Sequence, residues 1–336
     1  MKINSTDLND KTFIIAEIGN NHEGSYSLAE EMIGLAAEAG VDAVKFQTFK
    51  TELYINSKNK ERFEKIKSFE LSFNEFEKLS FYAKKMGLSF ISTPFDIESA
   101  SFLSEFVDAL KISSGDNNFF PLIKAVSKIG KPLIISTGLA DIDLIKKTKK
   151  LVERTWSENN IKQDLALLHC VTAYPVDAPY ANLNAIKTMQ NIFDCTIGYS
   201  DHTLGKSASI AAVCIGAKII EKHFTIDKNH SDFRDHQLSS DPKEMKELVE
   251  SIRKVEIYFG DGQKKQQPPE IKILSEVRRS IVAKKDLTKG DIVKKEDINW
   301  VRPSGGMQPG EEYKILGKTV VSKISKGENI LDKYLK

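Results

Sequence analysis

The sequence predicts a (β/α)8 TIM barrel followed by a small β-rich domain, on three observations. Short apolar runs alternate with amphipathic segments in eight units over about 250 residues, which is the size and count of such a barrel. The apolar runs are almost continuous, as expected of parallel strands covered on both faces. Several amphipathic segments end in glycine, the residue that commonly closes a helix.

The eight units follow one another from residue 13. The predicted strands are 13–19, 42–48, 89–95, 109–115, 132–138, 165–171, 195–201 and 218–225. The helical segments that follow them are 25–40, 74–87, 96–106, 121–130, 141–159, 182–193, 207–217 and 242–260, with an irregular stretch before the second. A doubly wound open sheet is the alternative, but eight regular units exceed its usual strand count.

The character of the sequence changes after Gly260. Residues 261–275 are polar, charged and proline-bearing, which predicts a linker between a barrel domain of 1–260 and a second domain of 276–336. In the second domain short strand-like pieces are separated by turn sequences such as TKGD and SKGEN. A domain of about 60 residues has room for only a small core.

Composition and charge exclude several classes of protein. The chain has 49 basic and 47 acidic residues, so its balance of +2 does not indicate a nucleic-acid partner. Residues 278–336, by contrast, carry 14 basic and 8 acidic side chains. Cys170, Cys195 and Cys214 lie in apolar runs and are expected to be reduced core residues. No apolar run approaches membrane-spanning length, so we expect a cytoplasmic protein that binds neither nucleic acid nor membranes.

Polar side chains stand at the carboxyl end of nearly every predicted strand. In a barrel these ends surround the active site. In chain order they are Glu17, Lys45, Gln47, Thr93, Lys111, Ser114, Ser136, Thr137, Thr172, Tyr174, Ser200, Asp201, His202 and His223. Strand ends attract polar residues in general, so the evidence lies in the whole set rather than in any single member.

Two lysines at these strand ends indicate an anionic ligand. Lys45 and Lys111 interrupt apolar runs two strands apart and would point into the barrel mouth. A buried lysine is costly without a partner, and the nearby hydroxyls would suit a phosphate group. The alternative for Lys45 is a structural ion pair with Glu17 or Asp42.

His202 and His223 end the last two strands and could share a metal ion, although each alone could equally be structural. Two imidazoles with water suit Mn, Fe, Co or Zn, and the sequence does not choose among them. Two protein ligands would leave positions open for activation of a carbonyl group. His169 and Cys170 could add ligands, but we expect them to pack in an apolar run.

Carboxylates provide candidates for acid–base chemistry, with Glu17 and Asp116 first and Asp201 and Asp235 behind them. Glu17 lies deep at the end of the first strand, where burial could raise its pKa. The remaining histidines fall in predicted loops, where polarity alone accounts for them: His22, His230 and His236.

A series of motifs resembles the sialic acid synthase family. They are IIAEIGNNHEGS, VKFQTF, FISTPFD, LKISSGD, LIISTG, LLHCVTAYP, IGYSDHTLG, IEKHFTIDKN and a tail that begins RRSIVAKKDLTKGDIV. The resemblance implies a TIM barrel followed by a SAF (antifreeze-like) domain. It also implies a transferase of carbohydrate biosynthesis that condenses phosphoenolpyruvate with N-acetylmannosamine or a related amino sugar and releases phosphate by C–O cleavage.

The resemblance also implies a cofactor, a partner and roles for single residues. The cofactor would be a divalent metal, most typically Mn²⁺ with Mg²⁺ or Co²⁺ as alternatives, held by His202 and His223, and Glu17 falls on the catalytic glutamate. The phosphoenolpyruvate ligands would be Lys45, Thr93, Lys111, Ser114, Ser136, Thr172 and Ser200. The sugar ligands would be Gln47, Asp116, Tyr174, Asp235 and Arg302, the last from the SAF domain of the partner in a domain-swapped homodimer.

Departures from the family pattern concern mainly the sugar. Asp116 stands where the family commonly has glutamate, and Thr172 where it often has asparagine. The loop 50–72 looks shorter than usual, and 230–241 differs from the common pattern. N-acetylneuraminate is the default product. Because of these departures, a legionaminate or pseudaminate synthase with a di-N-acetylated hexose acceptor is the alternative. A 3-deoxy-octulosonate-phosphate-type synthase and a non-catalytic sugar-binding barrel are more distant alternatives.

Overall fold

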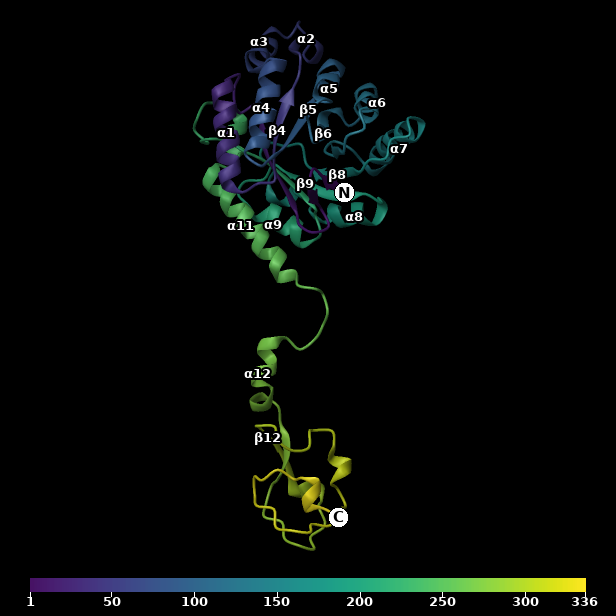
Figure 1. Ribbon diagram of the computed structural model, residues 1–336, viewed down its shortest axis with the longest axis vertical. Coiled ribbons are helices and arrows are strands. Elements are labelled where there is room, and N and C mark those ends of the chain that lie inside the picture. The colour runs from purple at the N-terminus through teal and green to yellow at the C-terminus, as the bar shows by residue number, and fades with distance from the viewer. The chain divides into compact units, whose positions relative to one another are not determined.

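The computed structural model describes residues 1–336, which divide into two compact units, Met1–Gly260 and Asp261–Lys336 (Figure 1). The first unit is a closed parallel barrel with the strand order β10-β3-β4-β5-β6-β7-β8-β9. Its strands are β3 Phe13–Gly19, β4 Ala43–Thr48, β5 Ser89–Pro94, β6 Ala109–Ile112, β7 Leu133–Ser136, β8 Leu165–Cys170, β9 Thr196–Asp201 and β10 Ile219–His223. The predicted TIM barrel is therefore confirmed, with every predicted strand in its predicted place.

Helices surround the barrel, and a principal helix follows each strand. They are α1 Tyr26–Ala39, α4 Phe73–Lys85, α5 Ile97–Leu103, α6 Phe120–Lys128, α7 Ile142–Glu158, α8 Asn184–Ile192, α9 Ser207–Cys214 and α11 Pro242–Phe259. Gly40, predicted as a helix end, is the left-handed C-cap of α1, where its N–H donates to the Ala37 carbonyl. None of the helices is both long and apolar enough to cross a membrane.

Several short elements were not predicted. They are the hairpin β1 Lys2–Ile3 with β2 Thr6–Asp7, and the helices α2 Thr51–Tyr54, α3 Lys60–Phe69 and α10 Arg234–Leu238, together with the 3-10 turns η1 Ser114–Asp116 and η2 Ala178–Tyr180. The strand predicted at 109–115 ends early, because Ser113 donates a 2.9 Å hydrogen bond to the Asp116 carboxylate across η1.

The inward face of the barrel changes from apolar to polar along most of the strands. Phe13 and Ile15 lie in an apolar cluster inside the barrel, which Ile3 and Leu8 of the amino-terminal segment join. Two residues further along β3 the inward position is Glu17, because successive inward side chains are two residues apart. The same change occurs on β4, where Ala43 belongs to the apolar cluster and the next inward residue is Lys45. The polar site is thus built on a closed apolar layer.

The second unit is small and has its own core. It contains α12 Pro268–Val277, an antiparallel pair of β11 Ser280–Ala283 with β12 Ile298–Val301, and the 3-10 turns η3 Lys295–Asp297, η4 Glu312–Lys314 and η5 Asp332–Tyr334. Residues from most of its predicted strand pieces form one apolar cluster, including Ile281, Leu287, Ile298, Val320 and Ile330. Part of the predicted linker 261–275 is helical instead, because Gln267 caps α12 and proline occupies its first turn.

The three cysteines differ in burial. None forms a disulfide, and Cys170 is buried, Cys195 is half-buried and Cys214 is exposed. The expectation that all three are core residues is therefore wrong for Cys214, which ends α9 at the surface.

Candidate active site

A cavity of about 490 Å³ opens at the carboxyl ends of the barrel strands. All but two of the predicted site residues of the barrel line it, namely Glu17, Lys45, Gln47, Thr93, Lys111, Ser114, Asp116, Ser136, Thr172, Tyr174, Ser200, His202, His223 and Asp235. Arg302 lies in the second unit, where its Nε donates to the Val277 carbonyl. Thr137 and Asp201 do not line the cavity, because Thr137 donates to the Leu168 carbonyl and Asp201 pairs with the buried Lys222.

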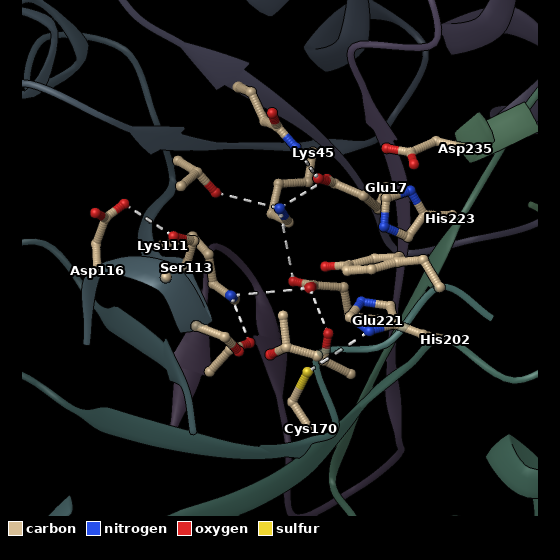
Figure 2. A pocket seen from close by; sticks show the side chains of 18 of the residues that line it. Glu17, Lys45, Lys111, Ser113, Asp116, Cys170, His202, Glu221, His223 and Asp235 are labelled. Atoms are coloured by element: carbon tan, nitrogen blue, oxygen red, sulfur yellow. Dashed lines mark hydrogen bonds and ion pairs between the residues drawn. The ribbon is translucent and has the colours of Figure 1, made fainter. Parts of the chain in front are cut away.

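Two lysines and two glutamates form a buried charge network in this cavity (Figure 2). Lys45 Nζ lies 2.7 Å from Glu17 Oε2 and 3.8 Å from Glu221 Oε2. Lys111 Nζ lies 3.8 Å from Glu221 Oε1. The structural alternative for Lys45 is therefore realised with Glu17, whereas Asp42 pairs with Arg253 at 2.7 Å.

Hydroxyl groups complete the surroundings of the two lysines. Lys45 Nζ donates to Thr93 Oγ1 at 3.2 Å, and Lys111 Nζ donates to Ser136 Oγ at 2.6 Å. Ser200 Oγ donates to Glu221 at 2.8 Å. Thr172 Oγ1 is buried without a hydrogen-bond partner, so it is free to contact a ligand in the cavity.

Burial and charge shift the pKa values of the four network residues in different directions. Burial, with a contribution from the neighbouring Glu221, raises the pKa of Glu17 even though Lys45 opposes the shift. Burial favours a neutral Lys45, but the two carboxylates outweigh it and raise the pKa of this amine. Burial lowers the pKa of Lys111. For Glu221 burial is outweighed by the two lysines, which lower its pKa. A proton on Glu17 would leave the network with a net positive charge.

The two histidines fit the chemistry of an open metal site. Their ring centroids are 5.5 Å apart. His202 Nδ1 donates to the Val171 carbonyl at 2.9 Å, which leaves Nε2 without a proton in the neutral ring. His223 Nδ1 is buried and lacks a hydrogen-bond partner, and burial lowers the pKa of this imidazole, so it stays neutral as a metal ligand must. No third His, Cys, Asp or Glu joins them in a metal-holding group, so water or substrate would complete the coordination.

The neighbours considered as extra ligands behave differently from each other. His169 packs, as expected, with Nε2 2.9 Å from the Ala181 carbonyl. Cys170 is buried but also lines the cavity, and its Sγ lies 3.9 Å from His202 Nδ1. Cys170 is therefore buried as expected, and it also forms part of the cavity wall.

The other end of the cavity carries groups of both charges. Asp235 accepts from Arg234 Nε at 3.2 Å, and the Arg234 guanidinium lies 4.7 Å from the centre of the Tyr174 ring. Asp116 lies on the opposite side of the cavity, beside Ser113 and Lys111 (Figure 2), and burial raises its pKa although a hydrogen bond from Ser113 opposes the shift.

Six cavity residues that carry polar or aromatic contacts were not among the predicted site residues: Tyr54, Arg62, Phe95, Ser113, Glu221 and Arg234. A signal existed for Glu221, because it stands two residues before His223 on one strand and therefore shares its face. Tyr54 and Arg62 belong to α2 and α3, in the stretch predicted to be irregular. The Tyr54 and Phe95 rings are stacked, with centroids 4.4 Å apart.

Comparisons with known proteins agree on the nature of both units. A model of the NeuB family matches residues 32–264, and a model of the SAF domain matches residues 278–336. The chain is 47% identical to an uncharacterised protein of Methanocaldococcus jannaschii, over 89% of this chain and 87% of that protein. It is 40% identical to the N,N'-diacetyllegionaminic acid synthase of Legionella pneumophila, over 96% of this chain and 94% of that enzyme. The crystal structure of the N-acetylneuraminic acid (sialic acid) synthetase of Leptospira borgpetersenii superposes with a TM-score of 0.73 at 36% identity, over 79% of this chain and 90% of that one.

Proposed function

This chain belongs to the NeuB family, and from that membership we propose that it is a nonulosonate synthase. It condenses phosphoenolpyruvate with N-acetylmannosamine or a related N-acylated amino sugar, and it releases phosphate. The observation that carries the proposal is the meeting of two buried lysines, a set of hydroxyls and two neighbouring imidazoles in one cavity at the carboxyl end of the barrel.

Lys45 and Lys111 would bind the phosphoenolpyruvate. Both ammonium groups face the same cavity, and Thr93 and Ser136 hold them there by hydrogen bonds. Ser114, Thr172 and Ser200 add hydroxyls that can donate to phosphate oxygens.

Glu17 would act as a general acid during the condensation. C3 of phosphoenolpyruvate forms a bond to the sugar aldehyde carbon, and the aldehyde oxygen must gain a proton to become a hydroxyl. Glu17 pairs in register with His223 on the adjoining strand and has a raised pKa, so it can deliver that proton. Water then adds at C2 and loses a proton, and the C2–O bond to phosphate breaks to leave the 2-keto acid.

We propose that His202 and His223 hold a divalent metal, with Mn²⁺ first and Mg²⁺ or Co²⁺ as alternatives. When bound, such an ion would polarise the sugar aldehyde as a Lewis acid. The protein's own contribution is to orient the rings, which the hydrogen bond from His202 Nδ1 to the Val171 carbonyl does for the first ring.

The balance of charges in the cavity outside the lysine network fits an uncharged acceptor sugar. Arg62 and Arg234 bring two positive charges to the cavity, and Asp116 and Asp235 bring two negative ones. This balance gives no net attraction for an acceptor phosphate, which argues against a 3-deoxy-octulosonate-phosphate-type reaction.

A di-N-acetylated hexose is the second candidate acceptor. The stacked Tyr54 and Phe95 rings offer an apolar wall in the cavity that would suit an additional acetyl methyl group. The 40% identity to an N,N'-diacetyllegionaminic acid synthase favours the same candidate.

We further propose a homodimer in which the SAF domain of one subunit caps the barrel of the other and brings Arg302 of the partner subunit to the sugar. Exposed apolar side chains on α12, among them Ile271 and Ile273, support a partner surface. Mixing Glu17→Gln with Arg302→Ala subunits tests this arrangement. Random pairing of two inactive variants should restore about a quarter of the wild-type activity if the site is shared between subunits, and none if it is not.

The biological setting follows from the chemistry. A nonulosonate synthase supplies sugars for cell-surface polysaccharide, and we propose that it acts in the cytoplasm. Three cysteines without a disulfide are consistent with a reducing compartment.

Phosphate release tests the proposed function. The purified protein is incubated with phosphoenolpyruvate, Mn²⁺ and a panel of mono- and di-N-acylated hexosamines with and without a phosphate, and each product is identified by mass. Release that depends on an unphosphorylated acceptor supports the proposal, and a preference for the phosphorylated hexosamines would contradict the uncharged acceptor. Silence across the panel from folded protein, with ligand binding intact in Glu17→Ala and His202→Ala, would favour a non-catalytic sugar-binding barrel.

A further inference from the structure

A second group of buried polar side chains lies behind the acceptor end of the cavity, and the reaction described above does not use it. Its centre is His236 on α10, which is fully buried and does not line the cavity. His236 Nε2 lies 2.9 Å from Glu23 Oε1, and its Nδ1 lies 2.6 Å from Thr225 Oγ1. The expectation that polarity alone accounts for this histidine is therefore wrong.

Glu23 is an ionised partner for this imidazole. Partial burial opposes its charge, but hydrogen bonds from Ser231 and His236 outweigh burial and lower the pKa of Glu23. An ionised carboxylate only accepts hydrogen bonds, so His236 Nε2 must carry the proton that lies between them. The contact is then a charge-assisted hydrogen bond between two loops, the one after β3 and the one after β10, which is the strong class of such bonds.

The loop after β3 holds the same segment at a second point. Asn21 is fully buried, and its side-chain amide donates to the Phe224 carbonyl at 2.8 Å and to Ser239 Oγ at 3.0 Å. Ser239 Oγ in turn donates to the main-chain carbonyl of Asp235 at 2.5 Å. Contacts from Asn21 and Glu23 therefore reach both sides of Asp235.

The residues held in this way face the acceptor. Arg234 and Asp235 immediately precede His236 on α10, and both line the cavity. Figure 2 shows the Asp235 carboxylate beside the His223 ring, at the end of the cavity away from Lys111. Helix α10 has only five residues, so its own hydrogen bonds contribute little to fixing these side chains.

We propose that the Glu23–His236 pair is a positioning latch that fixes Asp235 and Arg234 for recognition of the acceptor sugar, an inference that rests on the proposed function. Neither latch residue needs to touch the substrate. Breaking the latch should weaken acceptor recognition and leave the phosphoenolpyruvate half unchanged, because Lys45 and Lys111 are held by other strands.

The test compares three variants with the wild type. His236→Ala removes both hydrogen bonds, and His236→Gln retains an amide N–H for Glu23 and a carbonyl for Thr225. Lys228→Ala is the matched control, because it breaks an ion pair with Glu244 in the same loop but outside the latch. We expect KM for the acceptor to rise about tenfold or more in His236→Ala, with KM for phosphoenolpyruvate within about twofold of the wild type. His236→Gln should recover most of the loss, and Lys228→Ala should match the wild type.

Other results would overturn the latch. Equal changes in both KM values, or a loss in His236→Ala that the glutamine variant does not recover, would mean that His236 only stabilises the fold. Hydrogen–deuterium exchange of residues 226–241 provides a readout that does not depend on turnover. Faster exchange confined to this segment in His236→Ala supports the latch, and unchanged exchange contradicts it. A wild-type protein that is inactive with every acceptor would refute the proposed function while the exchange experiment still decides whether the latch exists.

Discussion

Neutralising Glu221 should destabilise the barrel and at the same time strengthen its binding of phosphate. Glu221 is the one carboxylate within 4.0 Å of both Lys45 and Lys111, at 3.8 Å from each. The substitution Glu221→Gln keeps the shape of the side chain and can still accept the hydrogen bond from Ser200. It removes the negative charge that compensates two buried cations.

The size of the effect follows from these distances. Opposite unit charges 3.8 Å apart attract by about 4 kcal/mol at an effective dielectric constant near 20, and Glu221 makes this contact twice. Removing one partner of a buried charge network typically costs about 3–5 kcal/mol, because it leaves buried charge without compensation. The cost is smaller than the sum of the two attractions because the desolvation penalty of the removed carboxylate is recovered. In a domain of this size such a loss should lower Tm by roughly 10 °C.

Phosphate should restore much of that loss. An anion that binds between the two lysines replaces the missing charge, and no carboxylate then competes with it. We expect the apparent Kd of inorganic phosphate to fall about tenfold or more, which corresponds to about 1.4 kcal/mol. At a free phosphate concentration 100 times Kd the variant should gain about 2.7 kcal/mol of stability.

Thermal unfolding over a series of phosphate concentrations, in the presence of a metal chelator, measures both the loss of stability and its recovery by phosphate. Asp201→Asn is the matched control, because Asp201 is fully buried and pairs with Lys222 at 3.0 Å but does not line the cavity. It should lose comparable stability, and phosphate should restore no more stability to it than to the wild type. The reasoning is refuted if phosphate stabilises the Glu221→Gln and Asp201→Asn proteins equally.

Three further predictions concern the metal, acidic pH and packing. His202→Ala should raise the Mn²⁺ concentration that half-activates phosphate release by roughly 100-fold, and an unchanged metal titration would argue against ligation. Burial lowers the pKa of His22 to about 4, so the unfolded state binds the extra proton and stability falls as the pH drops from about 6.5 toward 4. Urea unfolding at pH 7.5 and 4.5 should show a loss about 2–3 kcal/mol larger for the wild type than for His22→Gln. Gly198→Ala would put a Cβ 2.6 Å from the Ile219 carbonyl oxygen and should lower stability in a thermal melt by about 1–3 kcal/mol or more. Gly34→Ala in α1 is the control, because this site has room for a Cβ and stability should not fall.

The barrel could be predicted because its signal repeats. Each strand carries apolar residues on both faces, and on the inward face of most strands a polar residue follows the apolar ones toward the carboxyl end. Phe13, Ile15 and Glu17 show this along β3. A side-chain period of two and the rule that barrel sites lie at carboxyl strand ends then bring these polar positions together without any knowledge of tertiary contacts.

The loops that complete the site could not be predicted in the same way. Helix α3, which carries Arg62, buries only Phe69 among its ten residues, so it has almost no apolar periodicity to detect. What stabilises it locally is the Asn59 cap, and beyond that a tertiary contact between Phe69 and Phe233, whose rings are 5.1 Å apart. The hydrogen bond of the buried His236 could not be predicted for the same reason, because its partner Glu23 lies 213 positions away in the chain.

Lys45 shows that the structural and the functional interpretation of one buried lysine can both hold. Its ion pair with Glu17 is what the structural interpretation predicts, and its place in the cavity is what the functional interpretation predicts. The two agree because Glu221 is shared between both lysines at 3.8 Å, a distance at which attraction persists without a direct hydrogen bond. A phosphate that binds here would replace Glu221 as the counter-ion of Lys45 and Lys111, so the two lysines are compensated both before and after binding. We therefore propose that the network is the resting form of an anion site, whose affinity should depend on the charge of Glu221 more than on the number of lysines.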